Sequence, residues 1–169
     1  HRDLHSFPTR RSSDLLLNYN RKSTLGYLSK IKEFDLTKTF SAEGKELNSP
    51  IWILGHLATT QNYLCLKSTG AEMVRFSWAK LFGMGSVIPD AAGLPPVEEI
   101  VNVLNEVHQR SLTRILSLSN EDLALPTTTG FAMGGEDSYR AIIRHAIMHE
   151  GIHAGHMGWI CKLWGVKTI

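Results

Sequence analysis

The apolar residues of segment 95–116 recur at intervals of three and four, which is the spacing of one face of an α-helix. They are Val97, Ile100, Val101, Leu104, Val107, Leu112, Ile115 and Leu116. Pro95 and Pro96 come just before this run, where a helix tolerates proline. No segment shows the apolar and polar alternation of a half-buried strand. A chain of 169 residues can bury one core, so a single all-α domain is predicted.

Three further helices complete a predicted four-helix bundle. The first is expected over residues 16–32. The second begins at Asn48-Ser49-Pro50, which supplies a capping side chain followed by proline in the first turn, and it ends at Gly70. The fourth begins after Asp137 or Ser138 and runs to about residue 163. Loops are expected over residues 34–47, 70–94 and 119–137.

The connection between the second and third helices determines the predicted path of the chain. Its length of about 25 residues is unusual in a small domain and signals a crossover or a functional lid. A crossover permits an up-down-down-up bundle, in which the second helix runs antiparallel to the fourth.

The N-terminal residues are set apart from this domain. Residues 5–15 resemble a translated sequencing-library adapter, and the stretch contains a proline and no apolar period. We therefore treat residues 1–15 as an adapter artefact that is expected to be disordered, and predict the bundle over residues 16–169. An ordinary disordered tail is the alternative, and neither interpretation gives the segment a function.

Charge and hydropathy exclude several classes of protein. The 18 basic and 16 acidic residues give a formal net charge of +2, which offers no footprint for nucleic acid and no basic membrane patch. No segment has the ~18 consecutive apolar residues of a spanning helix. Cys65 and Cys161 lie in apolar helical stretches and are expected as buried, reduced thiols. We expect a cytoplasmic protein whose partners are small molecules or a second copy of itself.

Four histidines fall within an arc of roughly 80° on one face of the fourth helix. They are His145, His149, His153 and His156. Imidazoles four residues apart stand about 6 Å from each other and can converge on one cation at ~2.1 Å. The row rises over ~16 Å, so only one adjacent pair can serve as the clamp, and a third ligand must come from another helix. A polar surface stripe, or histidines satisfied within the core, is the alternative.

His56 is the expected third ligand, because Leu54 and Leu57 place it on the core-facing side of the second helix. A lone histidine on such a face is more often structural, but the pair in the fourth helix favours a ligand. If the two helices are antiparallel, His56 faces the later histidines of the row, and His149 with His153 fits. His108 falls on the polar side of the third helix and is expected at the surface.

Two segments make the chain recognisable. Residues 48–58, Asn-Ser-Pro-Ile-Trp-Ile-Leu-Gly-His-Leu-Ala, and residues 143–156, Ile-Arg-His-Ala-Ile-Met-His-Glu-Gly-Ile-His-Ala-Gly-His, resemble the DinB/YfiT-like superfamily of metal-binding four-helix bundles. The resemblance spans roughly residues 16–165. It implies His56, His149 and His153 as metal ligands in an up-down-down-up bundle that is often dimeric. His156 departs from the family pattern, where glutamine is common, and is our candidate catalytic residue.

Three imidazoles leave a coordination position open, which is typical of a reactive site. One divalent transition metal is expected, with zinc, nickel and iron as candidates. The resemblance favours a metal-dependent thiol S-transferase acting on a low-molecular-weight thiol, as in bacillithiol- and mycothiol-linked members. A metal-dependent hydrolase and a non-catalytic metal-binding stress protein are the alternatives. Glu150 points about 100° away from His149, which removes a general base and favours thiol chemistry.

Overall fold

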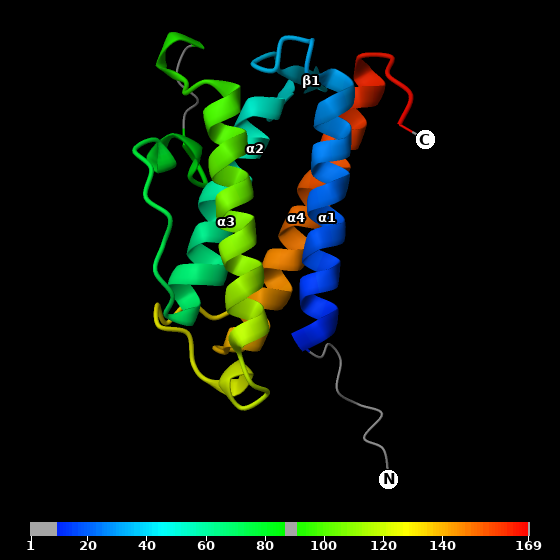
Figure 1. The fold of residues 1–169 in the computed structure, drawn as a ribbon. Coiled ribbons are helices and arrows are strands. Elements are labelled where there is room, and N and C mark those ends of the chain that lie inside the picture. Colours follow the sequence, from blue (N-terminus) through cyan, green and yellow to red (C-terminus); the bar gives the residue numbers. More distant parts are fainter. Residues whose placement is uncertain (1–9, 87–90, 169) are drawn as a thin grey trace.

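Four long helices lie side by side in the computed structural model, which describes residues 10–86 and 91–168 (Figure 1). They are α1 Arg10–Ile31, α2 Pro50–Gln61, α3 Val97–Ser117 and α4 Tyr139–Leu163. In Figure 1, α1 rises, α2 and α3 descend, and α4 rises again. The predicted all-α, up-down-down-up bundle is therefore confirmed. α2 and α4 are antiparallel, as the proposed ligand set requires.

The first helix begins at Arg10, so the expected disorder is wrong for residues 10–15. Residues 1–9 lie outside the described part of the chain. The buried face of α1 continues towards its N-terminus through Leu17 and Ser13, which lie one and two turns before Arg21. This face alternates apolar and polar side chains, and for that reason an apolar period does not reveal where the helix begins. The adapter origin of the segment stays a prediction.

The second predicted helix consists of three consecutive helical segments. They are α2 itself, a π-helical turn over Asn62–Leu66 and a 3-10 turn over Lys67–Thr69. The side chain of Ser49 caps the start by accepting a hydrogen bond from the backbone N–H of Trp52, as predicted. Gly70 ends the element with a left-handed backbone, φ 77°.

Residues 34–47 contain a short hairpin that the sequence analysis did not predict. β1, Phe40–Ala42, pairs antiparallel with β2, Lys45–Leu47. Glu43 and Gly44 make the turn with positive φ values of 50° and 75°, the backbone that two-residue hairpins favour. Each strand has only three residues, which is too short to give a periodic signal.

The core lies between the helices, and residues 70–86 of the crossover cover it on one side. α2 is buried almost all round, with Ile53, Leu54 and Leu57 at most 1% exposed. Residues 70–86 of the crossover run beside α2 and α3 in Figure 1, and the described parts of the crossover contain the 3-10 turns Ala79–Phe82 and Ala91–Gly93. Its Phe82 side chain is fully buried in the same cluster as α2. The predicted crossover therefore contributes buried side chains to the core of the bundle.

Both cysteines are free and buried, as predicted. Burial raises the pKa of Cys65 to about 12, so its thiol stays protonated. Within the described ranges, no helix combines the length and the apolar character needed to cross a membrane.

A buried ion pair joins the helices across the middle of the bundle. Arg21 of α1 is 2% exposed and donates from Nε to Glu150 Oε1 of α4 at 2.5 Å. The same guanidinium donates to Gln61 Oε1 of α2 and to the backbone oxygen of Leu104 of α3, both at 2.7 Å. One side chain therefore contacts the three other helices.

The surface position expected for His108 is wrong, because this side chain is 2% exposed. Its Nδ1 lies 3.4 Å from Gln61 Nε2, and its Nε2 lies 3.4 Å from Asn18 Oδ1. Burial, with a contribution from the nearby Arg21 charge, lowers the pKa of His108 to about 3. The polar interior around Arg21 accommodates a histidine that the local sequence assigned to solvent.

Candidate metal centre

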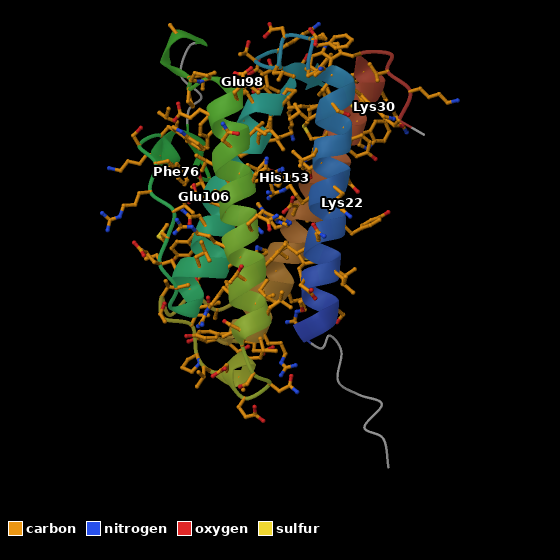
Figure 2. The ribbon with its side chains drawn as sticks, viewed as in Figure 1. Lys22, Lys30, Phe76, Glu98, Glu106 and His153 are labelled. Atoms are coloured by element: carbon orange, nitrogen blue, oxygen red, sulfur yellow. The ribbon has the colours of Figure 1, made fainter. Side chains whose placement is uncertain are left out.

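The three predicted ligands come together between α2 and α4. Their ring centroids are 5.0 Å apart for His56 and His149, 5.0 Å for His56 and His153, and 4.6 Å for His149 and His153. One nitrogen from each ring lies within 4.8 Å of the other two. His56 and His153 are buried and His149 is half-buried. Figure 2 shows His153 in the middle of the bundle.

The spacing of the nitrogens suits a single transition-metal ion. His56 Nε2 and His149 Nε2 are 3.1 Å apart. Two ligands at ~2.1 Å from a tetrahedral ion are about 3.4 Å from each other, so this pair needs a shift of only a few tenths of an ångström to share an ion. The cluster can therefore hold a metal ion.

A hydrogen bond from the crossover fixes the tautomer of His56. Its Nδ1 lies 2.8 Å from the backbone oxygen of Phe82. A carbonyl oxygen can only accept, so Nδ1 carries the hydrogen and Nε2 presents a lone pair to the cluster. Metal-binding histidines commonly donate their second N–H to a backbone carbonyl in this way. The Trp52 ring stacks on His56 at 4.4 Å and holds its plane.

The imidazoles of the cluster are neutral, so they do not repel a cation. Burial lowers the pKa of His56, of His149 to about 4 and of His153 to about 3, and neighbouring histidines contribute to the last two shifts. Neutral imidazole is the form that binds metals, so few protons must leave before an ion binds near neutral pH.

A sequence model of the DinB superfamily matches residues 16–157. The chain belongs to the DinB superfamily. The matched range contains His56, His149 and His153, so the resemblance found in the two histidine segments is confirmed. A search of curated proteins gave no match.

Close packing of the Phe82 ring explains why the residue before His56 is glycine in this DinB-superfamily protein. A Cβ atom at this position would lie 2.5–2.6 Å from atoms of the Phe82 ring, which is closer than carbon atoms can pack. Glycine therefore lets Phe82 lie directly against α2. The same residue supplies the carbonyl that orients His56, so the Gly-His pair connects core packing to ligand geometry.

We expect Gly55→Ala to cost about 1–3 kcal/mol of the free energy of unfolding, because Phe82 must move. Moving Phe82 also displaces the carbonyl that orients His56, so metal affinity should fall by about tenfold. Urea denaturation and competition with a chromophoric chelator measure the two effects. Gly155→Ala is the matched control, since nothing lies within 4 Å of the added carbon. It should leave metal affinity unchanged, and equal effects of both variants would contradict this role for Gly55.

The metal-free protein should lose stability as the pH falls below about 6.5, where the histidines of the unfolded chain take up protons. The folded pKa values of His149 and His153, about 4 and about 3, keep these side chains neutral in the fold. The unfolded state therefore binds more protons over this range, and the free energy of unfolding falls towards pH 4.

Melting curves of the metal-free protein between about pH 7.5 and pH 5 test this expectation. The His149→Ala/His153→Ala double variant lacks two of these groups and should show a shallower decline. A melting temperature that stays constant over the same range in the wild type would contradict the prediction.

The two outer histidines of the α4 row lie outside the group of three. The His145 ring centroid is 5.9 Å from that of His149. His156 is exposed, and its Nδ1 lies 3.3 Å from His153 Nδ1. His156 also reaches a neighbouring pocket of about 300 Å³. This pocket is lined by Glu46, Leu47, Asn48, Ile53, His156, Trp159 and Ile160. His156 therefore lies between His153 and the pocket.

Thr60 was not predicted as a site residue, yet its Oγ1 lies 3.5 Å from His56 Nε2. Thr60 is four residues after His56 on α2, so the spacing that identified the histidine pair of α4 also places it on the ligand face. Its residue type gave no signal of a site, because threonine is not a common metal ligand.

Proposed function

We propose that this DinB-superfamily protein is a metal-dependent thiol S-transferase that holds one divalent transition-metal ion through His56, His149 and His153. The observation that supports it best is the convergence of three neutral imidazoles from two helices. A three-histidine ligand set leaves a position for an external ligand, as catalytic rather than structural sites do. Imidazole ligands suit zinc, nickel and iron(II).

The proposed reaction joins a low-molecular-weight thiol to an electrophilic carbon. When bound, the ion would stabilise the thiol as its thiolate near neutral pH. A bond forms between sulfur and the carbon while the bond from that carbon to its leaving group breaks. The leaving group departs with the electron pair of the broken bond, and the thiol proton passes to solvent.

The chain's own residues would hold and place the reactants. The Phe82 carbonyl orients His56, and the 300 Å³ pocket that His156 lines offers the apolar side chains of Ile53 and Trp159 to an electrophilic acceptor. We assign His156 as the candidate catalytic residue, because it lines this pocket and lies 3.3 Å from His153. There it can hydrogen-bond the bound acceptor.

The position of Glu150 favours thiol transfer over hydrolysis. A carboxylate beside the ion would favour hydrolysis, because it could serve as the general base that activates water. The carboxylate of Glu150 is 2% exposed and accepts two hydrogen bonds from Arg21, at 2.5 and 3.1 Å. It is therefore engaged in the core, and the metal-ligand group found among the described residues consists of histidines alone.

The test incubates zinc-, nickel- and iron-loaded protein with 2-mercaptoethanol, cysteine or glutathione and a chlorodinitrobenzene acceptor. We expect a thioether product with at least one thiol, lost in His149→Ala and kept in His145→Ala. Cleavage of a nitrophenyl ester without any thioether would instead indicate a hydrolase. Tight metal binding with neither product would indicate a non-catalytic metal-binding protein.

A further inference from the structure

The hydroxyl of Thr60 is directed differently from those of Thr24 and Thr69. Thr24 and Thr69 donate to the backbone oxygen four residues earlier, at 3.2 and 2.7 Å, which is the usual arrangement in a helix. Thr60 instead places Oγ1 3.5 Å from His56 Nε2, the nitrogen that faces His149. Its half-buried side chain thus borders the place where the three ligands converge.

Metal binding would change the hydrogen-bond partner of this hydroxyl. The Nδ1 hydrogen of His56 is already donated to Phe82, so Nε2 is the nitrogen available to an ion. Once its lone pair binds an ion, Nε2 can no longer accept a hydrogen bond from Thr60. The hydroxyl then needs another acceptor, which can be the backbone oxygen of His56, four residues earlier, or an external ligand at the open position.

We propose that Thr60 is a positioning residue whose hydroxyl donates a hydrogen bond to the sulfur of the thiol that occupies the open position. This inference rests on the proposed thiol function and names a residue that would select an anionic ligand. A hydrogen bond to a charged acceptor is roughly twice as strong as one between neutral groups, so its loss should be measurable as weaker thiol binding.

Thr59 provides a matched control in the same helix. Its Oγ1 is buried and has no hydrogen-bond partner, and its side chain points about 100° away from that of Thr60. Thr59→Val and Thr60→Val therefore make the same chemical change on different faces of α2. Thr60→Ser keeps the hydroxyl, and Thr60→Ala removes it without adding a methyl group.

The experiment titrates cobalt-loaded full-length protein with 2-mercaptoethanol and follows the sulfur-to-cobalt charge-transfer absorption. We expect Thr60→Val and Thr60→Ala to weaken thiol binding by about tenfold. Thr60→Ser and Thr59→Val should stay within about twofold of the wild type. Imidazole binds through a nitrogen that has no further lone pair, so its affinity should be the same in all five proteins.

Two results would overturn the role of Thr60 while leaving the thiol function intact. One is an unchanged thiol affinity in Thr60→Val and Thr60→Ala. The other is an equal loss of thiol and imidazole affinity, which would indicate a purely structural effect. If the wild type binds cobalt but shows no thiol absorption, the proposed thiol function itself fails and takes this role with it.

Discussion

Replacing His149 by alanine should leave the protein essentially without metal. Loss of a group that merely orients a ligand lowers metal affinity by about 10–100-fold, so loss of a ligand should cost at least about 100-fold. Wild-type protein from zinc-supplemented medium should contain about one ion per chain, and His149→Ala less than about one-tenth of that. Elemental analysis of the purified proteins gives the stoichiometry, and competition with a chelator gives the affinity.

His145→Ala is the control for this experiment, because its ring lies one helical turn away from His149 and outside the group of three. It should retain about one ion per chain. His56→Ala and His153→Ala should behave like His149→Ala, since each supplies one of the converging nitrogens. Equal metal content in His149→Ala and the wild type would refute the ligand set.

Arg21→Met should destabilise the fold by about 3–5 kcal/mol, the largest effect on stability that we expect. The substitution leaves the Glu150 carboxylate buried without its partner, and it also removes the donors to Gln61 and Leu104. An uncompensated charge in the core is far more costly than a lost surface ion pair. Urea denaturation of the metal-free protein measures the loss without a contribution from bound metal.

Lys22→Met is the matched control, since Lys22 is the exposed neighbour of Arg21 on α1. It should change the free energy of unfolding by no more than about 0.5 kcal/mol. The Arg21→Met/Glu150→Met double variant should recover much of the loss, because buried ion pairs can often be replaced by apolar side chains. If Arg21→Met behaves like Lys22→Met, the ion pair does not stabilise the bundle.

Local patterns predicted the parts of the fold that depend on local physics. The spacing of apolar residues identified α3, and Ser49 with Pro50 marked the start of α2. The histidine row of α4 also followed from helix geometry, because residues four apart share a face. In each case the relevant neighbours lie within a few positions in the sequence. The choice of His149 with His153 within that row depended on the antiparallel path and on the family resemblance.

The features that were missed depend on contacts between distant segments. His108 is buried because Gln61 and Asn18 satisfy its ring nitrogens, and these residues are 47 and 90 positions away. The orientation of His56 likewise depends on the Phe82 carbonyl, 26 positions later in an irregular crossover. No local pattern records such partners, so His108, a polar residue with polar neighbours on its helix, was assigned to solvent.

The ligand set also joins parts of the chain that are far apart in sequence. His56 and His149 are separated by 93 positions, so an ion shared between them would cross-link α2 to α4. At a free metal concentration 1,000 times the dissociation constant, such binding adds about 4 kcal/mol to the stability of the folded state. Metal supply would then govern how long each molecule survives proteolysis. A shortage of metal would lower the amount of the protein as well as its activity.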